Sequence, residues 1–288
     1  MPREGVDYAW HHGVNVDAFR QDGISFAVRY LSNDVSKNLS RSEAQLLSDA
    51  GLDVAVVWET TATRALDGKS AGATDARKAV AQAKDCGMPA SRPIYFGVDF
   101  DATDQDKPRI ADYLRGAASV LGGKRVGVYG GYWVIKYCFD HAVASFGWQT
   151  YAWSGGQRDQ RAQLYQHANG VIIGGINCDR DTAYAADFGQ WRVQAAKAPP
   201  FPYPATDYLG TARPDPQCHS GVDALERQQI ARWQKRMAER GWRIEATGVF
   251  SRQSQRICSQ FQAEKGIDPA DGTVHADTWK KAWTAAVT

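Results

Sequence analysis

Six acidic residues in the first two thirds of the chain follow or end predicted β-strands. They are Asp7, Glu59, Asp99, Asp101, Asp179 and Asp181. Parallel strands of a barrel present their carboxyl ends at one face, so these side chains are expected to meet at one mouth. Carboxylates in one cleft repel one another, and at least one should keep a proton near neutral pH. A proton donor beside an ionised carboxylate is the pair that glycosidic cleavage requires.

Taken singly, each of these acids could be an ordinary loop residue, a helix N-cap or a salt-bridge partner. Their recurrence across distant segments favours a shared site. In Tyr95-Phe-Gly-Val-Asp-Phe-Asp101 two aspartates alternate with a phenylalanine. Residues two apart on a regular strand point to the same side, so Asp99 and Asp101 are both expected to face the mouth.

The elements that would position these acids alternate between apolar, β-branched segments and amphipathic helical patterns. The predicted strands are 5–8, 24–31, 54–59, 94–99, 125–129, 149–153, 163–167 and 171–176, and the predicted helices are 42–50, 74–86, 107–121 and about 132–144. Such alternation implies an α/β fold with parallel pairing and right-handed crossovers. Eight strands suit a TIM-like (β/α) barrel, and the short last connections predict abbreviated helices in its back half. An open doubly wound sheet is the alternative, which the lack of a glycine-rich loop after the first strand disfavours.

The composition changes after the predicted barrel, residues 1–192. Residues 193–222 hold Ala198-Pro-Pro-Phe-Pro-Tyr-Pro204 and read as a proline-rich linker, part of which packs down through its aromatic residues. Residues 223–288 predict a small all-α domain of three helices at about 225–241, 251–265 and 276–285, each with an apolar stripe. This segment carries 11 Lys and Arg against 8 Asp and Glu, a net charge of +3 that suits an anionic polymer.

Composition also limits the classes of partner and cofactor. The net charge of the whole chain, +2, is too small to indicate nucleic acid, and no apolar run reaches membrane-spanning length. Five scattered cysteines and the lack of a zinc-binding motif predict reduced thiols, no metal and no cofactor. We expect a monomer without membrane insertion.

Residues 1–190 resemble the glycoside hydrolase family 25 lysozymes, and still more the related glycoside-hydrolase-like barrels of actinobacteria and their phages. The motifs that carry the resemblance are Gly5-Val-Asp7, Ile94-Tyr-Phe-Gly-Val-Asp-Phe-Asp101, Tyr165-Gln166 and Cys178-Asp-Arg-Asp181. The resemblance implies a catalytic cluster of Asp7, Asp99, Asp101 and Asp179. In family 25 the position of Asp101 is a glutamate that donates the proton, so this chain has an acid one methylene shorter there.

From this resemblance we expect Asp101 to donate the proton and Asp99 to stabilise the oxocarbenium-like transition state or to assist the N-acetyl group of the substrate. Asp7 and Asp179 would position water and sugar hydroxyls, while Asp181 or Glu59 could supply a missing role. The side chains predicted to bind substrate are Glu59, Trp58, Tyr30, Tyr129, Trp153, Gln166 and Asp181.

Residues 223–288 are similar to the three-helix peptidoglycan-binding domains, with Ile230-Ala-Arg-Trp-Gln as part of the first helix and Asp271-Gly-Thr-Val-His-Ala-Asp-Thr-Trp279 opening the third. The segment around Cys218-His-Ser-Gly221 resembles the lead-in to such modules in actinobacterial phage lysins. A binder of protein, or a module that only stabilises the barrel, is the alternative.

Together these features predict an endolysin-like peptidoglycan hydrolase, a muramidase that cuts the glycan strands of the cell wall. Two alternatives remain, a wall-binding protein whose barrel has lost turnover and a glycosidase for another actinobacterial polysaccharide. Residues 1–7 lack an apolar signal-peptide core. We therefore expect a protein made in the cytoplasm without a signal peptide, which acts at the cell wall after release by a holin or by lysis.

Overall fold

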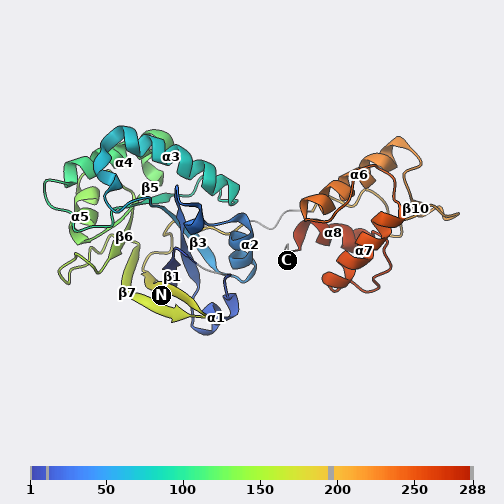
Figure 1. Cartoon of the computed structure of the whole chain (residues 1–288), viewed down its shortest axis with the longest axis horizontal. Helices are drawn as coiled ribbons and strands as arrows, with labels where there is room; N and C mark the ends of the chain where they lie inside the picture. Colours follow the sequence, from blue (N-terminus) through green and yellow to red (C-terminus); the bar gives the residue numbers. More distant parts are fainter. Residues whose placement is uncertain (1, 11–12, 194–197, 286–288) are drawn as a thin grey trace. The chain divides into compact units, whose positions relative to one another are not determined.

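The computed structural model describes residues 2–10, 13–193 and 198–285. The chain divides into two compact units, Met1–Val193 and Gln194–Thr288 (Figure 1). The strands of the first unit are β1 (Arg3–Tyr8), β2 (Phe26–Leu31), β3 (Asp53–Trp58), β4 (Ile94–Gly97), β5 (Val126–Gly130), β6 (Phe146–Thr150), β7 (Leu164–Ile173) and β8 (Ile176–Ala183). Its α-helices are α1 (Val16–Gln21), α2 (Arg41–Asp49), α3 (Gly68–Asp85), α4 (Lys107–Leu121) and α5 (Tyr132–Asp140).

The eight strands close into a barrel in sequence order, which confirms the predicted α/β barrel. Strands β1 to β7 pair in parallel, but β8 runs antiparallel to both β7 and β1. The prediction of an all-parallel barrel with a last strand at 171–176 is therefore wrong. That segment spans the end of β7 and the start of β8, joined through Gly174 and Gly175 with φ of +57° and +86°. Such left-handed glycines make a tight hairpin, which leaves no room for a crossover helix.

The front half of the barrel carries regular helices, and α3 and α4 pack with their backbones close together. A Cβ on Gly72 would lie 1.9 Å from the carbonyl oxygen of Tyr113, and one on Gly116 would lie 2.0 Å from that of Lys69. Only glycine permits this approach. In the described back half, no helix joins β6 to β7 or β7 to β8, as the short connections predicted.

Alternation along the strands separates two apolar layers. Inward residues such as Val28, Val57 and Tyr95 fill the barrel interior, whereas outward residues such as Val56 and Trp58 pack under the helices. Successive side chains on a strand point to opposite faces, so this division follows from the period of two. The interior is packed with side chains below the mouth, and any site must lie where the inward positions become polar.

The second unit contains β9 (Tyr208–Leu209), β10 (Cys218–His219), α6 (Ala224–Glu239), α7 (Arg252–Glu264) and α8 (Ala276–Thr284). Strands β9 and β10 pair in parallel, and both lie in residues 193–222, the segment predicted to be a linker. Phe201 and Tyr203 pack against the helical core, and the indole N–H of Trp279 donates to the carbonyl oxygen of Pro199 at 2.9 Å. The described part of the predicted linker therefore belongs to this unit, because its aromatic residues bury apolar surface there. Across the described residues, no helix has both the length and the apolar character needed to cross a bilayer.

Candidate active site

At one end of the barrel, the inward-facing residues of several strands are polar. On three strands an apolar inward residue is followed, two positions later on the same face, by a polar one. The pairs are Gly5 and Asp7 on β1, Val28 and Tyr30 on β2, and Leu164 and Gln166 on β7. The polar ring is completed by Glu59 and Asp99 just after β3 and β4, by Tyr129 on β5, and by Asp179 and Asp181 on β8. The sequence predicted that Asp179 and Asp181 follow the last strand. In the structure both lie within the antiparallel strand β8.

Gln166 lies at the centre of this ring. Its Nε2 donates to Asp7 Oδ2 at 2.7 Å and to Asp179 Oδ2 at 3.2 Å. Its Oε1 accepts a hydrogen bond from the Tyr129 hydroxyl at 2.9 Å. Asp7 also accepts from the Tyr30 hydroxyl at 3.0 Å. Gln166, Tyr30 and Tyr129 thus hold acids in place, one of the two roles expected for Gln166, and direct contact of the three side chains with substrate stays a prediction.

Asp7 and Asp181 form a buried carboxyl pair, with 2% and no exposure respectively. Asp181 Oδ1 accepts from the indole N–H of Trp148 at 2.7 Å, while its Oδ2 has no protein donor. Burial, followed by the charge of Asp179, raises the pKa of Asp7 to about 7. Burial and the charge of Asp7 raise the pKa of Asp181 well above its ordinary value. Of the two, Asp181 is therefore the acid whose protonated form the surroundings favour more strongly.

This pair predicts that the barrel is more stable in mild acid. The pKa of Asp7 is about 7 in the folded chain against about 3.8 when exposed, so folding retains a proton that is lost as pH rises through 7. We expect the free energy of unfolding to be about 2–3 kcal/mol greater at pH 5 than at pH 8. Urea titrations at both pH values measure it. In Asp7→Asn, which cannot titrate, the difference should shrink, and an undiminished difference would contradict the assignment.

A second pair, Glu59 and Asp99, lies at the same mouth. The Lys37 ammonium group lies 3.3 Å from Glu59 Oε1. Burial and then the charge of Asp99 raise the pKa of Glu59, which Lys37 opposes. Burial also raises the pKa of Asp179, and Asp99 adds to that effect. These mutual influences join both pairs into one acidic cluster. In the described residues no three His, Cys, Asp or Glu side chains are arranged to hold a metal ion.

Three predicted site residues lie apart from this cluster. Strand β4 ends at Gly97, so the alternation that would turn Asp101 towards the mouth stops short, and Asp101 is exposed. It lines a shallow hollow with Trp133 and Trp153, the latter 36% exposed. Trp58 is only 1% exposed, so the prediction that it stacks on a sugar is corrected: it follows an inward residue and points outward into the core.

Sequence reasoning missed Lys37 and Trp148. Lys37 ends a short 3-10 helix after β2, in a polar segment that carries no signal beyond one positive charge. Trp148 lies on β6, but the predicted strand began one residue later and excluded it. The apolar start of Phe146-Gly-Trp-Gln-Thr150 was the available signal.

A closed eight-stranded barrel with several coupled carboxyl groups at one mouth is the arrangement of a glycoside-hydrolase-like protein. Residues 17–183 match the family model described as "Rv2525c-like, glycoside hydrolase-like domain". The chain belongs to this family, which confirms the glycoside-hydrolase-like part of the sequence resemblance.

Two comparisons agree with this assignment. The chain is 31% identical over 192 residues to the Mycobacterium tuberculosis protein named "Putative peptidoglycan hydrolase Rv2525c", covering 62% of this chain and 80% of that one. The crystal structure of the M. tuberculosis Tat-secreted protein Rv2525c with L-tartrate superposes with a TM-score of 0.63 at 29% identity. That match covers 66% of this chain and 98% of the other. The HEPES complex of Rv2525c gives a TM-score of 0.62.

The comparisons overturn the predicted origin of the protein. Rv2525c is Tat-secreted, so the expectation of a protein made without a signal and released by lysis is wrong. That prediction took the composition of the first seven residues as a guide to export. The endolysin-like interpretation, which came from the strand-end acids and the wall-binding pattern, gains no support from these relatives.

Proposed function

We propose that this protein is a peptidoglycan hydrolase that cleaves a glycosidic bond of the wall glycan by carboxylate acid and base chemistry. The observation that carries the proposal is the polar ring around Gln166, in which coupled carboxyl groups of unequal pKa share one mouth. Pairs of acids whose environments separate their pKa values are what general acid catalysis beside an ionised carboxylate requires. The name of the M. tuberculosis relative, "Putative peptidoglycan hydrolase Rv2525c", supports peptidoglycan as the substrate.

The experiment is to incubate the full chain with purified actinobacterial peptidoglycan and to measure new reducing ends. Mass spectrometry of the released fragments then identifies the bond, and N-acetylmuramic acid at the new reducing end is the expected muramidase product. Tight sedimentation with the wall without new reducing ends would favour a binding protein with an inactive barrel. Products derived from arabinogalactan would indicate another polysaccharide as the substrate.

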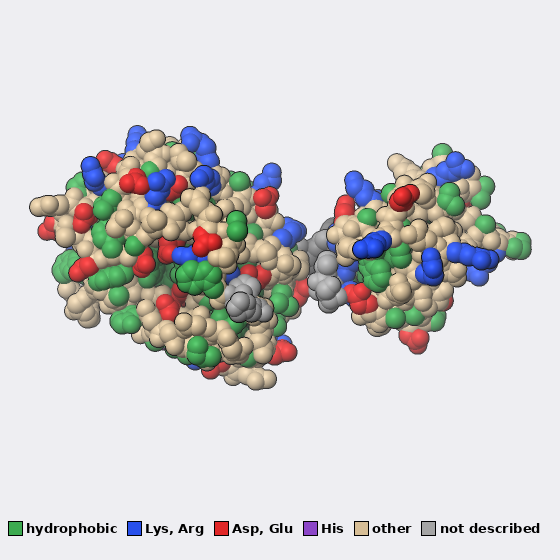
Figure 2. Space-filling view, in the orientation of Figure 1, with side chains coloured by type: hydrophobic (Ala, Val, Ile, Leu, Met, Phe, Trp, Pro, Cys, Tyr) green, Lys and Arg blue, Asp and Glu red, His purple; other side chains and the backbone are tan. Residues whose placement is uncertain are grey.

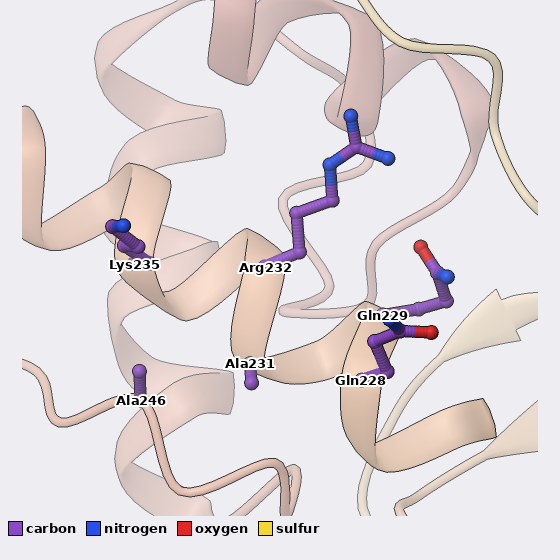
Figure 3. Close-up of a pocket in the computed structure, with 6 residues that line it drawn as sticks. All are labelled: Gln228, Gln229, Ala231, Arg232, Lys235 and Ala246. Atoms are coloured by element: carbon purple, nitrogen blue, oxygen red, sulfur yellow. The ribbon is translucent and has the colours of Figure 1, made fainter. Parts of the chain in front are cut away.

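The second unit is proposed to hold the catalyst on the wall, as its resemblance to peptidoglycan-binding domains implies. A groove of about 420 Å³ runs along α6, lined by Gln228, Gln229, Ala231, Arg232, Lys235 and Ala246 (Figure 3). Arg232 and Lys235 are exposed, and no described residue forms an ion pair with either. Figure 2 shows basic side chains spread over the visible face of this unit. Attachment to an insoluble polymer raises the local concentration of the attached barrel.

The groove predicts a loss of wall affinity when its charges are removed. The double variant Arg232→Gln, Lys235→Gln should sediment with peptidoglycan about tenfold more weakly at low salt, since two exposed charge contacts contribute about 1–2 kcal/mol together. The matched control is Arg252→Gln, Arg256→Gln, which removes the same charge from exposed positions of α7. Equal weakening in both variants would point to net charge instead of the groove.

A further inference from the structure

We propose that Glu59, and not Asp101, is the residue that donates the proton to the glycosidic oxygen. The inference rests on the proposed function and deepens it, because it names the acid of the same site. It is motivated by where the barrel places the two side chains, one at the mouth beside Asp99 and the other exposed outside the ring.

The backbone directs Glu59 towards the mouth. Its N–H donates to the carbonyl oxygen of Leu31 at 3.0 Å, so the β2–β3 ladder continues one residue beyond β3. Ala55 and Val57 face the barrel interior, and the period of two turns Glu59 to the same side. Asp101 has no such support, because β4 ends at Gly97, four residues before it.

The neighbouring strand leaves space for the Glu59 side chain. A Cβ on Gly97 would lie 3.3 Å from Glu59 Cγ and 3.5 Å from Glu59 Cβ. The absence of a side chain at Gly97 therefore lets Glu59 lie across the end of β4, two residues before Asp99. The Glu59 side chain is 14% exposed, so its carboxyl group is partly desolvated but not sealed in the core.

The two carboxyl groups of this pair are not equivalent. Burial and then the charge of Asp99 raise the pKa of Glu59, while burial alone raises the pKa of Asp99, and Lys37 lowers both. A negative charge on Asp99 therefore favours the protonated form of Glu59, which suits Glu59 as the acid and Asp99 as its ionised partner. This is the division of roles between an acid and an ionised partner.

In the proposed step the Glu59 carboxyl proton moves to the glycosidic oxygen as its bond to the anomeric carbon breaks. The leaving sugar departs as an alcohol, and Asp99 faces the positive charge that develops on the ring. Lys37, 3.3 Å from Oε1, stabilises the glutamate anion that results. Water supplies the hydroxyl group for the anomeric carbon, and its remaining proton restores Glu59.

The test compares Glu59→Gln with Asp101→Asn on two kinds of substrate. On purified peptidoglycan, whose leaving group needs a proton, Glu59→Gln should lower kcat about 100-fold or more, the usual contribution of a general acid. On a 2,4-dinitrophenyl glycoside of a wall disaccharide, whose leaving group needs no proton, the loss should stay within about tenfold. Asp101→Asn should stay close to the wild type on both substrates. Thermal unfolding checks that both variants are folded.

The outcomes separate this inference from the proposed function. Wild-type protein without turnover on any wall substrate would refute the function, and the inference with it. Active wild type with an equally active Glu59→Gln variant would overturn the inference alone, as would a loss in Asp101→Asn that depends on the leaving group. Should Glu59→Gln not fold, Glu59→Asp replaces it, with a smaller loss on peptidoglycan and none on the dinitrophenyl glycoside expected.

Discussion

Replacing Asp99 by asparagine should lower kcat on peptidoglycan by about 10²–10⁴-fold while KM changes little. Asp99 lies two residues after β4 at the mouth, beside the proposed acid Glu59 and within the electrostatic influence of Asp179. Its negative charge would oppose the positive charge that develops at the anomeric carbon. That charge exists only in the transition state, so its loss affects turnover far more than binding.

The measurement is the rate of release of reducing ends over a range of peptidoglycan concentrations. Asp112→Asn is the matched control, because Asp112 is an exposed residue of α4 that pairs with Arg115 at 2.8 Å. Unlike Glu59→Gln, Asp99→Asn should be equally impaired on the dinitrophenyl glycoside, since its role does not depend on the leaving group. A kcat within about threefold of wild type would remove Asp99 from the catalytic groups.

The second large effect concerns stability. Arg29→Met should destabilise the barrel by about 3–5 kcal/mol, because it breaks a buried ion pair by removing the guanidinium that faces Glu43. Arg29 has no exposure, and its Nε lies 2.6 Å from Glu43 Oε1. The guanidinium also donates to the carbonyl oxygen of Tyr8 and lies 4.2 Å from the centre of the Tyr8 ring. This ion pair joins β1 and β2 to α2 beneath the mouth.

Urea unfolding at pH 7 measures the effect. The control is the double variant Arg29→Met, Glu43→Leu, which removes both charges and should recover much of the lost stability, since an apolar pair avoids the desolvation of a lone carboxylate. If the double variant loses as much free energy of unfolding as the two single variants lose together, packing and not charge explains the role of Arg29. Since Arg29 points outward from β2, the acids at the barrel mouth should keep their raised pKa values in folded variants.

Several features of the barrel could be predicted from the sequence. The apolar, β-branched segments were enough to place strands β1 to β5 within a few residues, because alternation and turn signals act over neighbouring residues. The same local signals gave α2 and α4 to within one residue of the structure. The short last connections correctly predicted a back half without full helices. Asp7, Asp99, Asp179 and Asp181 were identified as candidates because strand-end acids recur across distant segments of the chain.

Only the tertiary structure determined the direction of the last strand and which acids lie at the barrel mouth. The antiparallel course of β8 places Asp179 and Asp181 inside a strand, and this depends on its pairing with both β7 and β1. The end of β4 at Gly97 leaves Asp101 outside the ring, while the ladder beyond β3 brings Glu59 into it. Local periodicity specifies which residues share a face, but only closure of the barrel determines where each strand stops and which carboxyl groups meet. For that reason the acids could be named from the sequence, whereas their distinct environments followed only from the fold.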